Sequence, residues 1–177
     1  MSVLAQKNIL IGVSGGIAAY KAPLLIRQLV KLKCNVKVVM TPSSKEFVTP
    51  LTLSTVSNND VFSEFTTEKN NNPTWNNHVE LAEWADVFII APATSNTISS
   101  MASAQCNNLL LACYLSSTCP VFVAPAMDLE MYKNTLNQTN IKKLVSNNTD
   151  VLPVGSGSLA SGPVSYTHLT LPTKCSV

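Results

Sequence analysis

Short apolar runs alternate with stretches of helical periodicity along most of this chain, and this alternation restricts the fold more than any other feature of the sequence. The runs at 8–13, 36–40 and 87–91 are rich in β-branched residues and short enough to be strands. The run at 87–91 reads VFIIA, which is typical of a strand buried on both faces of a parallel sheet. Residues 17–32 carry apolar side chains at helical spacing. The alternation therefore predicts an α/β protein, a parallel sheet with helices on both faces.

Length and charge limit the class of protein further. The chain has 177 residues, enough for one domain with a sizeable core. Its formal net charge of +2 gives no reason to expect nucleic acid or an acidic membrane as a partner. Charged residues make up 12% of the chain, about half the usual share of roughly 25%, so we expect another subunit to cover part of the surface. No apolar run reaches the roughly 18 residues of a membrane span.

The N-terminus and the cysteines both favour the cytoplasm. The first residues, MSVLAQKNILIG, lack the basic start and the cleavage site of a signal peptide. The five cysteines form no C-x-x-C pair and are odd in number, so we expect reduced thiols. The two histidines, His78 and His168, stand far apart, and no metal site is predicted.

Four polar loops follow predicted strands, at the edge of the sheet where ligands of such folds bind. The first, S-G-G at 14–16, leads into a predicted helix, whose N-terminal amides and dipole form an anion site. It is neither a P-loop nor a complete dinucleotide fingerprint. The strand at 36–40 also ends without an acidic residue for an adenosine ribose, so a mononucleotide phosphate fits better than NAD. Taken alone, the first loop could equally be a tight turn that binds nothing.

The other three loops are T-P-S-S at 41–44, P-A-T-S-N-T at 92–97 and P-A-M-D at 125–128. The hydroxyl and amide side chains of 92–97 could bind phosphate or the polar atoms of a ring, or they could cap the following helix. Asp128 has two comparable roles, as the N-cap of the next short helix or as a catalytic group.

One histidine follows an Asn-rich segment. Residues 66–77 are polar and contain Pro73, which predicts a loop, and His78 comes directly after it at the start of a predicted helix. A lone histidine at such a position is usually solvent-exposed and without function. If it faced the ligand, it could act as a base and contribute roughly 10²–10⁴-fold in rate.

Three segments taken together resemble the homo-oligomeric flavin-containing cysteine decarboxylases. They read GVSGGIAAYKA, HVELAEWADVFIIAPATSNT and APAMDLEMY, and they occur in the order found in that family. The similarity covers about residues 7–162 and is greatest to the phosphopantothenoylcysteine decarboxylases. It implies a Rossmann-like (flavodoxin-like) flavoprotein decarboxylase domain over residues 1–162. It also implies a homotrimer or a dodecamer, with flavin at subunit contacts.

The resemblance implies roles for individual residues. The cofactor would be FMN, held by six residues of three loops: Ser14, Gly15, Ser43, Ser95, Asn96 and Thr97. The catalytic base would be His78, and substrate would be bound by Pro125, Met127, Asp128 and Met131. The implied reaction is decarboxylation of 4′-phosphopantothenoylcysteine to 4′-phosphopantetheine in coenzyme A biosynthesis.

Three positions depart from the family pattern, and one of them is Tyr132, which stands where the family has a tryptophan. Asp128 replaces an asparagine, and an ionised carboxylate repels the substrate carboxylate to which an amide donates. Ser161 replaces the cysteine that supplies the final proton, and a hydroxyl is a much weaker acid than a thiol. The alternatives are therefore a peptide-cysteine oxidative decarboxylase, which releases the oxidised enethiol, and a non-catalytic FMN-binding regulatory subunit. The presence of His78 favours an enzyme.

Residues 163–177 match neither the glycine-rich flap of the family nor the ligase domain of its bifunctional members. The segment PVSYTHLTLPTKCSV resembles translated sequencing-adapter or vector sequence. We therefore expect a non-native tail on a truncated gene fragment, in which His168 and Cys175 have no function.

Overall fold

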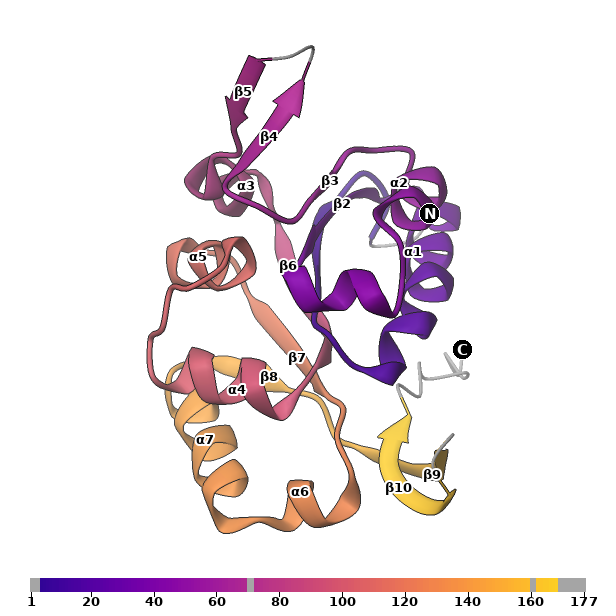
Figure 1. Cartoon of the computed structure of the whole chain (residues 1–177), viewed down its shortest axis with the longest axis vertical. Coiled ribbons are helices and arrows are strands. Elements are labelled where there is room, and N and C mark those ends of the chain that lie inside the picture. The colour runs from indigo at the N-terminus through magenta and orange to yellow at the C-terminus, as the bar shows by residue number, and fades with distance from the viewer. Residues whose placement is uncertain (1–3, 70–71, 160–161, 169–177) are drawn as a thin grey trace.

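The computed structural model describes residues 4–69, 72–159 and 162–168 (Figure 1). One sheet contains six parallel strands in the order β3-β2-β1-β6-β7-β8. Their bounds are β1 Asn8–Val13, β2 Asn35–Met40, β3 Val61–Phe62, β6 Val87–Ala93, β7 Val121–Pro125 and β8 Thr149–Val151. The chain builds outward from β1 to β3 and then returns to the other side of β1, which is the strand order of the Rossmann fold. The predicted Rossmann-like α/β fold is confirmed.

Helices cover both faces of the sheet, as predicted (Figure 1). One face carries α1 (Ala22–Lys31) and α2 (Pro50–Ser57), and the other carries α3 (His78–Trp84), α4 (Ser95–Ala102), α5 (Leu109–Ser116) and α7 (Thr135–Ser146). Alternate residues of β1 divide between the two cores. Ile9 and Ile11 pack with α1 and α2, whereas Leu10 packs with the helices of the other face. This division explains why residues 9–13 of β1 and all of β6 carry no polar side chain.

The first helix begins late. Residues Ile17–Lys21 form a 3₁₀ turn, η1, and α1 starts at Ala22 with Pro23 in its first turn. Proline is tolerated there because the amide it lacks would have no partner within the helix. Because α1 starts only at Ala22, the backbone of the loop at 14–16 and of η1 lies between the end of β1 and the helix, at the edge of the sheet.

The segment predicted as a loop at 66–77 contains a β-hairpin, so that prediction is wrong. Strands β4 (Thr66–Lys69) and β5 (Asn72–Trp75) pair antiparallel and project beyond the sheet (Figure 1). All four residues of β5 are exposed. Because neither face of this strand is buried, its sequence lacks the alternation by which strands are recognised.

The C-terminal part of the described chain forms a second small pair of strands. Strand β9 (Gly155–Leu159) pairs antiparallel with β10 (Gly162–His168). Strand β10 begins at the predicted domain boundary, which stays a prediction. Cys175 lies outside the described residues, as does Ser161.

The described residues also bear on the sequence-based expectations about a membrane span, a metal site and the thiols. Within the described ranges the longest helix, α7, has 12 residues, and no helix is long and apolar enough to cross a bilayer. Across the same ranges no three His, Cys, Asp or Glu side chains lie close enough together to hold a metal ion. The four described cysteines are free, and burial raises the pKa of Cys113 to about 12.

Candidate active site

Ser14 joins the ends of β1 and β6, where the order of the strands reverses. Its hydroxyl donates to the Pro92 carbonyl at 2.6 Å and accepts from the Thr94 amide at 3.0 Å. Ser14 is fully buried. Its only hydroxyl proton is therefore used inside the protein, and the serine holds the loops at 14–16 and 92–97 together. Ligands of Rossmann-type sheets bind at this reversal point.

Two adjoining cavities open at this edge of the sheet. The apolar hollow, of about 340 Å³, is lined by Gly15, Gly16, Ile17, Ala18, Thr94, Ser95, Asn96, Ala126, Met127, Asp128 and Met131. The polar hollow, of about 300 Å³, is lined by Gly15, Thr41, Pro42, Ser43, Thr94, Asn96, Thr97, Ser100, Asn107, Asn108 and Leu111. Gly15, Thr94 and Asn96 belong to both linings. The two cavities thus form one site with a hydrophobic end and a hydrogen-bonding end.

Gly15 allows two loops to meet at the junction of the hollows. A Cβ atom at this position would lie 2.8 Å from the Ser43 Cβ and 2.9 Å from the Ser43 carbonyl carbon. Ser43 belongs to η2 (Pro42–Glu46), the 3₁₀ turn after β2. Real Cβ atoms do not approach other carbon atoms so closely, so a side chain at Gly15 would push η2 away.

The N-terminus of α4 faces both hollows. Thr94 is its N-cap, and its hydroxyl accepts from the Thr97 amide at 3.4 Å. Asn96, in the first turn, is exposed and lines both cavities. The positive end of the helix dipole and the neutral donors around it favour an anionic group at the polar end.

Asp128 stands at the rim of the apolar hollow. It occupies the N-cap position of the short helix α6 (Leu129–Lys133), but its side chain accepts no capping hydrogen bond. It is the one ionisable side chain among the described residues that line either hollow. Its carboxylate therefore sets the charge at this end of the site.

His78, the first residue of α3, is not part of either lining. The preceding residue, Asn77, caps the helix by accepting from the Val79 and Glu80 amides. The His78 ring makes an edge contact with Phe65, with 6.1 Å between ring centroids. Its Nδ1 atom is buried and has no hydrogen-bond partner among the described residues. A single chain therefore does not bring His78 to the hollows.

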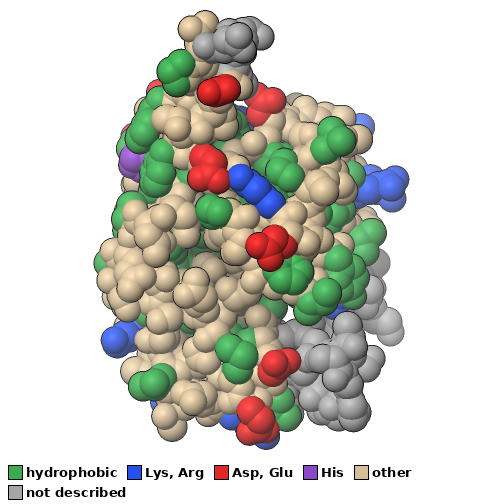
Figure 2. All heavy atoms as spheres, in the orientation of Figure 1, with side chains coloured by type: hydrophobic (Ala, Val, Ile, Leu, Met, Phe, Trp, Pro, Cys, Tyr) green, Lys and Arg blue, Asp and Glu red, His purple; other side chains and the backbone are tan. Residues whose placement is uncertain are grey.

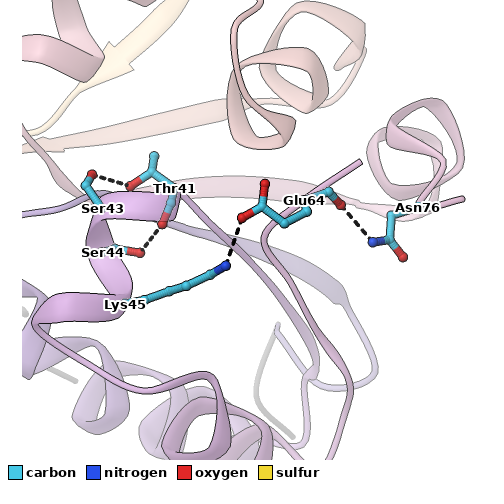
Figure 3. A network of polar contacts seen from close by, with 6 residues as sticks. All are labelled: Thr41, Ser43, Ser44, Lys45, Glu64 and Asn76. Atoms are coloured by element: carbon cyan, nitrogen blue, oxygen red, sulfur yellow. Dashed lines mark hydrogen bonds and ion pairs between the residues drawn. The ribbon is translucent and has the colours of Figure 1, made fainter. Parts of the chain in front are cut away.

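A polar network connects the polar hollow to the segment before His78 (Figure 3). In η2, the Ser44 hydroxyl donates to the Thr41 carbonyl at 2.7 Å, and the adjacent Lys45 ammonium pairs with the Glu64 carboxylate at 2.8 Å. The buried Asn76 amide donates to the Glu64 carbonyl at 2.7 Å. The base of the hairpin is thus fastened to the loop that follows β2.

Asn76 is expected to contribute more to stability than the ion pair beside it. Asn76→Ala leaves the Glu64 carbonyl without its donor, and we expect the free energy of unfolding to fall by about 1–3 kcal/mol. Lys45→Ala removes a pair whose side chains are 37% and 49% exposed, and the expected loss is below about 1 kcal/mol. Urea unfolding of both variants measures the difference. Equal losses would contradict this ranking.

The structure brings together most of the predicted site residues. Eight of them line the hollows: Gly15, Ser43, Ser95, Asn96, Thr97, Met127, Asp128 and Met131. Ser14 and Pro125 are buried and belong to neither lining, and His78 lies apart. Ser161 is outside the described residues.

The sequence reasoning missed several residues of the polar hollow, among them Asn107 and Asn108. Asn108 is the N-cap of α5 and accepts from the Leu111 amide at 3.0 Å. An asparagine directly before the apolar run LLLAC is a helix-start signal that could have identified this position. No comparable signal marks Ile17 and Ala18, which line the apolar hollow.

The strand order, the glycine at the reversal point and the two-ended cavity define an α/β protein of the nucleotide-binding type. Comparison of the sequence with protein families then gives a direct assignment. The chain belongs to the Flavoprotein family, whose model matches residues 2–169.

Relatives and solved structures agree with this assignment. The bifunctional coenzyme A biosynthesis protein CoaBC of Bacillus subtilis is 39% identical over 170 residues, which cover 96% of this chain and 41% of that protein. A solved PPC decarboxylase variant in complex with pantothenoylaminoethenethiol is 30% identical, with a TM-score of 0.77 and coverage of 92% of this chain and 90% of the other. The peptidyl-cysteine decarboxylase EpiD is 26% identical, with a TM-score of 0.76 and coverage of 90% of each chain. The chain spans about two fifths of the length of the curated CoaBC relative.

Proposed function

We propose that this chain is an FMN-dependent carboxy-lyase that converts 4′-phosphopantothenoylcysteine to 4′-phosphopantetheine in coenzyme A biosynthesis. The observation that carries the proposal is the two-ended site at the reversal point of the sheet. The similarity to CoaBC and to the PPC decarboxylase structure supports the choice of reaction and substrate. The four cysteines within the described part of the chain are free, which is compatible with action in the cytoplasm.

The residues of the hollows fit FMN. The polar hollow offers hydroxyl and amide groups beside the N-terminus of α4, which suit a phosphate and the hydroxyls of a ribityl chain. The apolar hollow offers Ile17, Ala126 and Met127, which suit the ring system. We assign Ser43, Asn96 and Thr97 to contacts with the cofactor and Ser14 to holding the two loops in place.

A cysteine carboxylate that loses CO₂ needs an acceptor for the electrons. A bound FMN would supply this chemistry by taking two electrons from the thiol-bearing carbon of the substrate and returning them as hydride after CO₂ has left, so that the net reaction is redox-neutral. The chain itself positions and protects the reactants. Met127 and Met131 line the apolar hollow, where they would pack against the substrate and exclude water. Asp128 can accept a hydrogen bond from a substrate amide, while its negative charge opposes the substrate carboxylate. We assign Pro125 to supporting this segment and Ser161 to the final proton transfer.

We assign the role of base to His78 and propose that it serves the site of a neighbouring copy in a homo-oligomer, a homotrimer or a dodecamer. His78 belongs to neither hollow of its own chain. Its ring contacts Phe65, on which the exposed Trp75 stacks with 5.7 Å between ring centroids. Much of the face seen in Figure 2 is uncharged, as the low share of charged residues leads one to expect. A second copy that covers apolar surface would account for both features.

Two related functions remain alternatives, because the negative charge of Asp128 at the substrate-binding end of the site opposes the carboxylate of the proposed substrate. One is a peptide-cysteine oxidative decarboxylase, supported by the likeness to EpiD. The other is a non-catalytic FMN-binding regulatory subunit. The oxidative decarboxylase would release a different product from that of the proposed function, and the regulatory subunit would release no product.

The test is a visible absorption spectrum of the purified chain before and after anaerobic addition of 4′-phosphopantothenoylcysteine. We expect a flavin spectrum that bleaches transiently, with 4′-phosphopantetheine as the product by mass spectrometry. The serine analogue of the substrate, which lacks the thiol, is the control and should leave the spectrum unchanged.

Each other outcome of this test selects another function. A product lighter by two hydrogens, with the flavin left reduced, indicates oxidative decarboxylation. A flavin spectrum that does not respond indicates a binding subunit. A folded preparation without flavin would overturn the cofactor assignment.

A further inference from the structure

Helix α6 forms a wall of the apolar hollow and is held by side chains from α7. It has five residues, none of them buried, and a helix of this length is not stable alone. The Asn137 Nδ2 atom donates to the Met131 carbonyl at 2.7 Å, and the Gln138 Nε2 atom donates to the Tyr132 carbonyl at 2.6 Å. Carbonyls in the last turn have no partner within the helix, and the backbone amide of the C-cap residue Asn134 reaches the Met131 carbonyl only at 3.3 Å. The two amides therefore anchor α6 by its C-terminal end, and strand β10 also contacts this helix.

Asn137 also reaches the opposite wall of the apolar hollow. Its Oδ1 atom accepts a hydrogen bond of 2.7 Å from the hydroxyl of Ser95, the first residue of α4. Ser95 and Met131 both line the apolar hollow, whereas Asn137 is buried behind it. A single buried amide thus joins the loop after β6 to the helix after β7.

The direction of these bonds follows from the chemistry of the groups. The Met131 carbonyl can only accept, so the nitrogen of the Asn137 amide must face it and the oxygen must face Ser95. Ser95 then donates its only hydroxyl proton to Asn137. Toward a ligand in the hollow, the Ser95 hydroxyl can therefore only accept a hydrogen bond.

We propose that Asn137 is a positioning residue, which sets the separation between the cofactor loop at 94–97 and the substrate segment at 127–131. The proposal rests on the proposed function for the identity of the two ligands, but the bridge itself is independent of them. The same bond fixes what Ser95 can offer a ligand. Its oxygen accepts a hydrogen bond from an N–H or O–H group of the ligand, and its hydroxyl does not donate to a phosphate oxygen.

The test is the variant Asn137→Asp, which keeps the acceptor for Ser95 but cannot donate to the Met131 carbonyl. Hydrogen exchange of the ligand-free chain is the first readout. We expect the α6 amides to exchange about tenfold faster or more, with the strands β1 and β6 unchanged. The matched control is Asn140→Asp on the same helix, because within the described residues Asn140 has no hydrogen bond to α4 or α6.

The second readout is kinetic. In the FMN-loaded chain we expect Asn137→Asp to raise the KM for 4′-phosphopantothenoylcysteine about tenfold, with kcat and the Kd for FMN changed by less than about threefold. A change in KM without a comparable change in kcat or in the Kd for FMN distinguishes displacement of the substrate segment at 127–131 from general damage to the protein. If Asn137→Asp does not fold, Asn137→Ala, which removes both bonds without adding charge, provides the same exchange measurement.

The outcomes separate failure of this proposal from failure of the proposed function. Unchanged exchange of α6 in Asn137→Asp or Asn137→Ala, or the same acceleration in Asn140→Asp, overturns the positioning role. Acceleration confined to α6 in a protein that neither binds FMN nor turns over substrate supports the bridge and rejects the proposed function.

Discussion

Asparagine in place of His78 is expected to lower the turnover of 4′-phosphopantothenoylcysteine by about 10²–10⁴-fold while leaving FMN bound. Imidazole is the side chain that takes and releases a proton near neutral pH, and asparagine cannot do so. Because the contacts with FMN are assigned to Ser43, Asn96 and Thr97 and not to His78, the flavin content should not depend on His78. The measurement is the rate of flavin bleaching in a single anaerobic turnover, normalised to the flavin absorbance of each preparation.

The control for this variant is Glu83→Gln, an uncharged replacement at an exposed position of the same helix. It is expected to keep full turnover. Wild-type turnover in His78→Asn would eliminate the proposed base. Loss of flavin together with turnover would show that His78 supports the fold rather than the chemistry.

Gly15→Ala is expected to weaken FMN binding by about 10–100-fold. The added methyl group would contact both the side chain and the backbone of Ser43, so η2 must move away from the first loop. A 10–100-fold change is about 1.4–2.8 kcal/mol, which lies within the roughly 1–3 kcal/mol that crowding of this kind typically costs, if the loss falls on the bound state. Titration of the flavin-free chain with FMN, followed by fluorescence quenching, gives the Kd.

Gly16→Ala is the matched control. A Cβ atom at Gly16 would meet only the Thr94 methyl carbon, at 3.0 Å, and the extended backbone there suits any residue. We expect a smaller loss of affinity than in Gly15→Ala. Equal Kd values for the two variants would contradict the role of the contact between Gly15 and Ser43.

The His78→Asn and Gly15→Ala variants together test the assignment of His78 to a neighbouring copy. Oligomers that contain both His78→Asn and Gly15→Ala chains would combine an intact His78 with an intact cofactor site across a subunit contact. We expect such mixtures to regain part of the turnover that each variant alone has lost. If the mixtures recover no turnover, His78 does not act in the site of a neighbouring copy.

The fold could be predicted where a local residue pattern is compatible with only one kind of structure. The run at 87–91 is entirely apolar because β6 is covered by helices on both faces. The S-G-G loop after β1 was predicted to lie where ligands bind, and Gly15 lines both hollows. These signals located the edge of the sheet at which both hollows open.

The parts that were not predictable depend on contacts that leave no local pattern. Strand β5 is exposed on both faces, so its sequence looks like a loop. Asn137 stands in a helix with exposed polar neighbours, and only the folded chain shows that it is buried between Ser95 and Met131. The position of His78 relative to the hollows is likewise a property of the tertiary structure.

The bond from Ser14 across to β6 also has a consequence for folding. Ser14 joins residues that lie 78 and 80 positions further along the chain, Pro92 and Thr94. The ligand site therefore forms only when distant parts of the parallel sheet have assembled, which is a slow kind of event in folding. A ligand present at a hundredfold excess over its Kd would stabilise the native state by about 2.7 kcal/mol. Ligand binding at this edge would thus act on the stability of the whole sheet, and the thermal midpoint of unfolding would rise with ligand concentration.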